Sequence, residues 1–506
     1  MIPWLLLSIG APLALGLLLI RMAWQPGLTL RAGLLQLTLA CGLGIGISSC
    51  TFFLYMAKVQ PEGPRLAFVE PALFLCVIAV CLAFGRTRRS LRAQPVAGPS
   101  TLAPFPGSPD TIPKPLLIGF CAVLACAVAG LILVSINKPH GGGDALGIWN
   151  MRARFMFRGH ELWMRGFSGM IAWSHPDYPL LIPSSIARLW TYIGFDTHRV
   201  PQVLSGFFAF ATVAALASSL AVLRSARHAV EAALFLLATA YFVRLGGDQY
   251  ADIPMGFFIL STAVLLMLSE ATAATGGSKG LLSLAGMTAG FAAWTKNEGM
   301  LFVLAAVVAL TATTLVKRGF RDSVRTLGLF LIGLIPVLLV IFYFKVRYAP
   351  PNDLFGSHDL GPFLARLRDS HRYALIARAF GNELLRWGNG LTAVFVIYLV
   401  ARGVTSRRPH PTFVSAGFIA LALMFVGYFF VYVLTPMDLI WHLGTSLERL
   451  LLQMWPTFLF LLFLVIGPAG SLLSRADSAQ KDRTRGASRQ SLIGATEEYL
   501  ARPNET

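Results

Sequence analysis

Acidic side chains beside apolar segments are the groups of this sequence that can do chemistry. Asp144 follows three glycines in the segment 140–150 (HGGGDALGIWN), just after a long apolar run. Glycines allow a tight turn, and a carboxylate in partly apolar surroundings can become basic enough to take a proton from a hydroxyl group. The alternative is an ordinary helix N-cap. Asp144 is therefore either a general base or a cap, with Trp149 beside it.

Two later segments also place ionisable residues at the start of apolar runs. Asp252 lies two residues before a proline, where it is both a good helix cap and a candidate functional carboxylate. Lys296 and Glu298 form a polar break between two short apolar runs. Charges at membrane depth are costly unless they are paired or functional, so these residues are site candidates. The alternative for Lys296 and Glu298 is a structural ion pair that closes a hairpin.

The segment between these groups is rich in cations and in turn-forming residues. Arg154 and Arg158 are four residues apart, so on a helix they share one face and can hold a lipid phosphate or simply anchor to headgroups. The prolines at 176 and 179 fix an extended path that presents His175, Asp177 and Tyr178 together. These side chains can bind phosphate, sugar or a metal, although their spacing fits no standard zinc pattern. The alternative is a structural hydrogen-bond knot.

The elements that must position these residues are membrane-spanning helices. The chain has 506 residues, 56% of them apolar and only 13% charged, against about 25% charged in soluble proteins. A span needs about 20 apolar residues. The predicted fold is therefore an all-α polytopic membrane protein with about thirteen transmembrane helices and short amphipathic helices in its outer loops. The predicted spans are 3–20, 33–57, 66–84, 115–136, 201–223, 229–246, 254–272, 281–295, 299–316, 326–344, 389–401, 412–434 and 455–474.

The basic residues predict which ends of the spans face the cytoplasm. The densest short basic run, 86–92 (RTRRSLR), belongs inside by the positive-inside rule, and the other loops then follow. The N-terminus is expected outside, the C-terminus in the cytoplasm, and every candidate site residue on the outer face. The net charge of +18 is then explained mainly by topology rather than by nucleic-acid binding.

A proline-rich stretch divides the chain. Residues 1–92 form an N-terminal three-span segment, and 93–114 read as an extended cytoplasmic linker. Residues 115–474 form the transmembrane core, whose outer loops carry the candidate site. Residues 475–506 are a basic cytoplasmic tail that is expected to be largely disordered.

Five motifs in this order resemble the GT-C superfamily of glycosyltransferases. They are Asp144 in the first large outer loop of the core, a His-Pro-x-Tyr-Pro turn at 175–179, Tyr-Ala-Asp-x-Pro at 250–254, Thr-Lys-x-Glu-Gly at 295–299 and Glu448-Arg449 before the last span. The likeness covers about 115–474. Within the superfamily the chain is most similar to bacterial proteins that resemble protein O-mannosyltransferases and the aminoarabinose transferases of lipid A.

The resemblance implies transfer of a sugar from a polyprenyl monophosphate such as undecaprenyl phosphate to a hydroxyl group, with inversion, on the periplasmic side of a bacterial inner membrane. The partners would be this lipid-linked donor, a glycan, lipid or protein acceptor of the cell envelope, and membrane lipids. Asp144 matches the general base, and Asp252 and Glu298 match further acidic positions that we expect to be catalytic. The expected donor phosphate ligands are Arg152, Arg154, Arg158, His175, Lys296, Arg372 and Arg449; the expected substrate contacts are Trp149, Asp177, Tyr178, Asp248, Tyr250 and Glu448.

Two departures from the family pattern qualify this expectation. The first-loop acid is usually followed by a second one, but Asp144 is followed by Ala145, which argues against an Asp-Glu metal site. Cations can neutralise the phosphate instead, so we expect neither a metal nor another cofactor. The three N-terminal spans and the proline-rich linker are also unusual for this superfamily.

Other classes of protein fit parts of the pattern. A transporter or flippase for lipid-linked sugars would place ionisable residues at mid-membrane and show inverted repeats, whereas here the charges gather in outer loops. An O-antigen ligase or polymerase would use outer Arg and His residues, which the long loop 345–388 supplies. A receptor or scaffold without chemistry is the third alternative.

Overall fold

The structure is a computed structural model that describes residues 2–27, 29–59, 63–90, 111–273, 278–352, 360–402 and 411–466. These residues form helices joined by loops, which confirms the predicted all-α membrane fold. The predicted linker 93–114 lies outside the described residues except for its last four positions. The predicted tail 475–506 lies wholly outside them.

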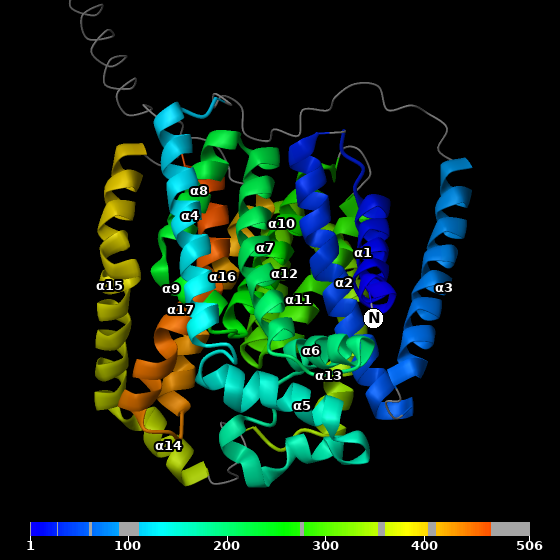
Figure 1. The fold of residues 1–506 in the computed structure, drawn as a ribbon. Helices are drawn as coiled ribbons and strands as arrows, with labels where there is room; N and C mark the ends of the chain where they lie inside the picture. The colour runs from blue at the N-terminus through cyan, green and yellow to red at the C-terminus, as the bar shows by residue number, and fades with distance from the viewer. Residues whose placement is uncertain are drawn as a thin grey trace, which may run out of the picture.

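Long helices form a bundle (Figure 1). Their bounds are α1 Ile2–Ala23, α2 Leu30–Val59, α3 Gly63–Ser90, α4 Lys114–Asn137, α7 Arg199–Leu223, α8 Ala226–Ala238, α9 Ala240–Gly247, α10 Asp252–Ala271, α11 Ser278–Thr295, α12 Glu298–Arg318, α13 Phe320–Arg347, α15 Ser370–Arg402, α16 Thr412–Leu434 and α17 Leu439–Val465. The shorter elements are η1 Ala145–Trp149, α5 Asn150–Arg158, η2 His160–Phe167, η3 Gly169–Ser174, α6 Leu181–Ile193 and α14 Leu360–Arg368.

Each predicted span overlaps a helix or a helix pair, but fewer helices qualify as spans than the thirteen predicted. Among the described residues, ten helices are long and apolar enough to cross a membrane, or eleven if α8 and α9, which are bent by 67°, form one broken span. Within the described part of α3, the apolar stretch Leu66–Ala79 is too short to span a membrane. The other difference is α11, which carries Gly, Ser and Thr among its apolar residues.

Small residues explain why α11 is an interior helix. A Cβ atom on Gly286 would lie 1.8 Å from the backbone oxygen of Phe330, and one on Gly333 would lie 1.7 Å from the oxygen of Ser283. Helices α11 and α13 therefore touch backbone to backbone, which side chains larger than glycine would prevent. Helix α10 beside them is buried along the whole of its apolar window. The core of the bundle lies around these helices.

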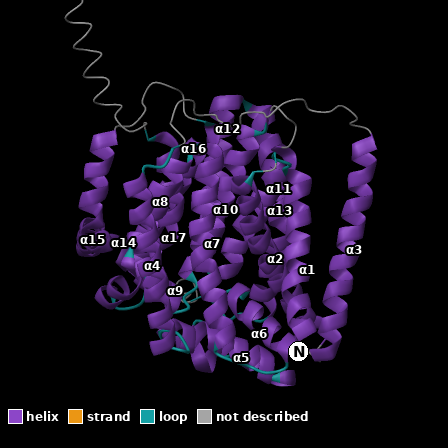
Figure 2. Cartoon of the chain, turned by 45° about the horizontal axis from the view of Figure 1, so that its top comes forward, coloured by secondary structure: helices purple, strands orange, loops and turns teal. Residues whose placement is uncertain are grey.

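Helices at the rim of the bundle expose apolar side chains. Figures 1 and 2 show α3 and α15 at opposite edges. Only 11% of the apolar window of α15 and 6% of that of α4 is buried within the chain. Apolar surface on this scale fits contact with lipid.

The three N-terminal helices pack onto the rest of the bundle through a buried ion pair. Glu70 of α3 is 3% exposed and accepts hydrogen bonds from Arg188 of α6, at 2.8 and 2.9 Å from the arginine Nε, and from the hydroxyl of Tyr192 at 2.7 Å. The other end of Arg188 donates to the backbone oxygen of Ser8 in α1. The helices before the linker are thus fastened to α6, an element of the core.

The short helices gather at one end of the bundle. Figure 1 shows α5 and α6 at the end toward which the first residues of α1 also point. The predicted amphipathic stretch is helical as expected, over Asn150–Arg158. Helices α10 and α12 begin at this end, so it brings together the polar motifs that sequence analysis singled out.

Candidate active site

Charged side chains of alternating sign form a continuous cluster at this end. Asp144 pairs with Arg449 at 2.5 Å, Arg449 with Asp252 at 3.1 Å, Asp252 with Lys296 at 2.9 Å, and Lys296 with Glu298 at 2.7 Å. We call these five residues the charged cluster. All five were among the candidate residues predicted from the sequence, which did not predict their mutual pairing.

Different segments supply the members of the charged cluster. Asp144 follows α4, Asp252 begins α10, Lys296 lies between α11 and α12, and Glu298 begins α12. The expectation that Arg449 heads the last helix is wrong, because α17 begins at Leu439. Arg449 therefore lies about three turns inside α17.

Asp252 is the buried centre of the cluster. Its side chain is fully buried, and it accepts hydrogen bonds from Lys296 at 2.9 Å, from Gln453 Nε2 at 2.6 Å and from Arg449 Nε at 3.1 Å. A buried carboxylate is tolerated when cations and donors satisfy its oxygens in this way. Asp252 thus holds the two cations in place and has no exposed surface for a substrate.

Gln453 was missed by the sequence analysis. It is fully buried in α17, and it also accepts a hydrogen bond from the hydroxyl of Tyr428 at 2.7 Å. The sequence offered one clue to its role. Gln453 is a polar residue inside an apolar run, and it lies four positions after Arg449 and therefore on the same helix face.

Asp144 faces the open side of the cluster. Its side chain is 24% exposed, and it makes no cap hydrogen bond to the described residues that follow it, so its side chain does not act as a helix cap. The glycines before it are required by close contacts. Gly141 has a φ of +80°, and a Cβ on Gly142 would lie 2.8 Å from the ring of Tyr250.

Aromatic rings line the approach to the cluster. Tyr178 stacks on Trp149 with ring centroids 5.6 Å apart and on His175 at 5.1 Å, while Lys296 Nζ lies 5.9 Å from the centroid of Tyr178. The guanidinium of Arg449 lies 4.7 Å from the ring centroid of Tyr250. Burial and the charge of Glu298 raise the pKa of Tyr178 well above its usual value, so its hydroxyl keeps its proton.

Glu298 carries an unsatisfied oxygen. Its Oε1 pairs with Lys296, as the predicted hairpin pair would, but its buried Oε2 accepts no hydrogen bond from the residues the structure describes. An unpaired buried acceptor is unfavourable by about 1–3 kcal/mol. A hydroxyl group of a ligand would satisfy it.

Arg152 lies inside the protein and not at the surface where a phosphate could bind. It is fully buried and donates to the backbone oxygens of Ser174 at 2.9 Å and of His175 at 3.0 Å. Burial lowers its pKa to about 10. Its contacts fix the turn that carries His175 and Tyr178, so we assign it a positioning role.

Three further arginines that were predicted as phosphate ligands have their partners outside the charged cluster. Arg158 and Arg154 both face Asp196, at 2.5 and 3.7 Å. They share a helix face as predicted, but their partner is a carboxylate. Arg372 donates to the backbone oxygens of Tyr432 at 3.0 Å and of Thr435 at 3.2 Å, where it satisfies the end of α16.

The remaining acidic candidates have structural partners. Asp177 accepts hydrogen bonds from Asn297 and Asn352, each at 2.7 Å, with Lys345 at 3.5 Å. This is the hydrogen-bond knot weighed as an alternative.

The other two predicted acidic contacts bind cations outside the charged cluster. Asp248 pairs with Lys138 at 2.8 Å, and Glu448 lies 4.0 Å from Arg244. Like Asp177, they are held by neighbouring side chains.

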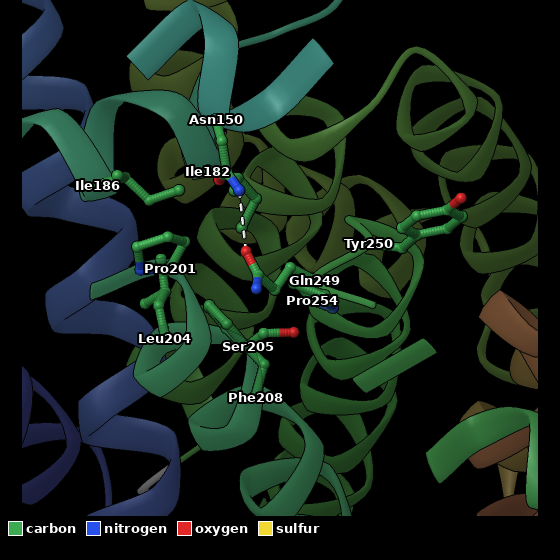
Figure 3. A pocket seen from close by; sticks show the side chains of 10 residues that line it. All are labelled: Asn150, Ile182, Ile186, Pro201, Leu204, Ser205, Phe208, Gln249, Tyr250 and Pro254. Carbon is green, nitrogen blue, oxygen red and sulfur yellow. Dashed lines mark hydrogen bonds between the residues drawn. The ribbon is translucent and has the colours of Figure 1, made fainter. Parts of the chain in front are cut away.

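An apolar pocket adjoins the charged cluster (Figure 3). Side chains of α6 and α7, including Ile182, Ile186, Leu204 and Phe208, line it together with Asn150, Pro201, Ser205, Gln249, Tyr250 and Pro254. Asn150 Nδ2 donates to Gln249 Oε1 at 2.8 Å across its polar side. Figure 3 shows the ring of Tyr250 directed away from this pair. Since that ring also contacts Arg449, the pocket and the cluster share one wall.

The helical bundle and the charged cluster at one end define a multi-pass membrane protein with a polar site where its spans begin. Comparison with known families specifies the class further. Residues 175–343 match the family model described as dolichyl-phosphate-mannose-protein mannosyltransferase, a GT-C-type glycosyltransferase domain. The match includes Asp252, Lys296 and Glu298. No significant match was found among curated proteins or solved structures.

The family match agrees with the resemblance seen in the motifs. It supports a membrane glycosyltransferase that uses a polyprenyl-phosphate-linked sugar. Asp144 and Arg449 lie outside the matched residues, so their part in the site rests on the geometry of the charged cluster.

Proposed function

We propose that the protein transfers a sugar from a polyprenyl monophosphate to a hydroxyl group of a cell-envelope acceptor, with inversion, at the periplasmic face of a bacterial inner membrane. The single observation that carries the proposal is the charged cluster, in which a partly exposed carboxylate, Asp144, contacts the cation Arg449. The orientation follows from the basic residues, which favour the opposite end of the bundle as the cytoplasmic one.

Asp144 acts as the general base because it is the most exposed carboxylate of the cluster, at 24% against 18% for Glu298 and none for Asp252. Its carboxylate takes the proton of the acceptor hydroxyl as that oxygen attacks the anomeric carbon. The bond from this carbon to the phosphate oxygen breaks, and the polyprenyl phosphate leaves with the electron pair. A single displacement of this kind inverts the anomeric centre.

Arg449 contacts the departing phosphate, and Lys296, whose side chain is only 3% exposed, adds its positive charge from a buried position between Asp252 and Glu298. Charge develops on the leaving oxygen, and cations held in place before the reaction stabilise it without reorganisation. Asp252 and Gln453 are positioning residues. Asp252 accepts hydrogen bonds from both cations, and Gln453 donates a hydrogen bond to Asp252.

Tyr178 and Glu298 are suited to binding the sugar. The unsatisfied Oε2 of Glu298 can accept a hydrogen bond from a sugar hydroxyl, and Tyr178, whose ring already stacks on Trp149 and His175, can contact the sugar through its edge or its hydroxyl.

We also propose that no divalent metal is needed. Asp144, Asp252 and Glu298 each pair with Arg449 or Lys296 in the charged cluster, so protein cations already supply the positive charge that a metal would bring. Transfer should persist in EDTA. Loss of transfer in EDTA that manganese restores would contradict this proposal.

The test of the proposed function is mass spectrometry of lipids and envelope glycans from a strain that lacks the gene. A polyprenyl-phosphate-linked monosaccharide should accumulate, and one glycan decoration should disappear, because donor synthesis continues while transfer stops. Unchanged lipid-linked sugars together with unchanged glycans would contradict the proposal. A lipid-linked sugar trapped on the cytoplasmic leaflet would indicate a transporter instead.

A further inference from the structure

Arg449 serves two carboxylates at once. Its Nε and Nη2 both contact Asp252 at 3.1 Å, and the same Nη2 contacts Asp144 at 2.5 Å. Among the residues that the structure describes, none accepts a hydrogen bond from Nη1 of Arg449. The base and the phosphate-binding cation of the proposed reaction are therefore bound to each other.

This pairing works against catalysis. While one of its oxygens is bound to Arg449, the carboxylate of Asp144 has less room to receive the proton of an acceptor hydroxyl. The same contact occupies Nη2, so a phosphate can bind both terminal nitrogens of Arg449 only after Asp144 has left. Both groups become fully available only when they separate.

The two contacts of Arg449 differ in how firmly they are held. Asp252 is fully buried, and Lys296 and Gln453 also bind it. Asp144 is partly exposed and lies in the first helical residues before η1, directly after the turn at Gly141 and Gly142. The contact with Asp144 is therefore the one that can give way, while Asp252 keeps Arg449 in place.

We propose that the donor phosphate displaces Asp144 from Arg449, so that donor binding frees the general base. This inference rests on the proposed function. The guanidinium exchanges one anionic partner for another through Nη2, and no charge is left unpaired at Arg449. Asp144 then faces the acceptor hydroxyl and takes its proton in the transfer step. It follows that the donor binds before the acceptor becomes reactive.

The test measures the affinity of purified protein in nanodiscs for polyprenyl monophosphate, the product that carries the same phosphate. Asp144→Asn removes the competing charge and should tighten binding about tenfold, which corresponds to about 1.4 kcal/mol. Glu161→Gln is the matched control, since it removes one charge from an exposed position of the same face without touching Arg449. It should change the affinity less than twofold.

Free polyprenol, which lacks the phosphate, separates lipid binding from phosphate binding. Its affinity should be the same for wild type and Asp144→Asn. Asp144→Ala should reproduce the tighter phosphate binding, and it replaces Asp144→Asn if melting temperatures show that the latter is misfolded.

The outcomes distinguish the inference from the proposed function. Phosphate affinity that is unchanged or weaker in both Asp144 variants, with normal binding by wild type, overturns the competition but leaves the glycosyltransferase proposal standing. Wild-type protein that does not prefer polyprenyl monophosphate to polyprenol contradicts the proposed function and the inference with it.

Discussion

Removing the charge of Asp252 should destabilise the protein far more than the same change at Asp248. Asp252→Asn keeps the shape of the side chain but leaves the buried Lys296 and Arg449 with one fewer anion between them. Breaking a buried ion pair in this way is unfavourable by about 3–5 kcal/mol. The side chain of Asp248 is itself only 8% exposed, but its partner Lys138 is 50% exposed, so loss of this pair leaves a lysine that water can solvate and should be unfavourable by only about 1 kcal/mol.

The assay is unfolding of the purified protein in detergent, followed by tryptophan fluorescence during a denaturant or heat ramp. The substitution is identical at the two sites, although Asp248 lies at the C-terminal end of α9 and Asp252 in the first turn of α10. Asp252→Asn should unfold clearly earlier than wild type, and Asp248→Asn should nearly coincide with it. Equal stabilities of the two variants would refute the reasoning, because the charged cluster would then not be a buried network.

Three further predictions follow from contacts in the site. Glu298→Gln should weaken donor binding about tenfold, measured as KM against kcat, because an amide replaces the unpaired Oε2, and it should also lower the melting temperature because the buried Lys296 loses one of its two carboxylate partners; a change in kcat alone would contradict a sugar contact. Gly142→Ala should lower both activity and melting temperature, since the new Cβ would lie 2.8 Å from the Tyr250 ring. Wild-type activity and melting temperature would contradict this close contact between Gly142 and Tyr250. Arg158→Ala should change transfer less than threefold, because its partner is Asp196, and a loss of donor affinity would restore it as a phosphate ligand.

The fold could be predicted from composition and apolar run length because a bilayer imposes both. Thirteen apolar runs each correspond to a helix or a helix pair, since any segment inside a membrane must satisfy its own backbone hydrogen bonds. The length of an apolar run did not predict that a membrane-spanning helix can continue through polar turns. The first four turns of α17 include His442, Glu448 and Arg449, so hydropathy placed its start 16 residues too late.

The members of the charged cluster could be predicted individually, but not as a network. Asp144, Asp252, Lys296, Glu298 and Arg449 stood out because charge beside apolar sequence is costly. Which cation meets which carboxylate depends on helix packing, and Asp144 and Arg449 lie 305 positions apart.

The predicted phosphate ligands have different surroundings, which the sequence did not separate. Residue type cannot distinguish Arg449, which enters the cluster, from Arg152, which holds a turn, or Arg372, which caps the end of a helix. Only their neighbours in space separate these roles.

The measurement that tests the central claim most directly is complementation of the deletion strain with wild type and with Asp144→Asn at equal expression, read by mass spectrometry of lipids and glycans. Wild type should clear the accumulated lipid-linked sugar and restore the missing decoration. Asp144→Asn, folded and present in the membrane, should do neither, because it lacks the base. Full restoration by Asp144→Asn would contradict the account.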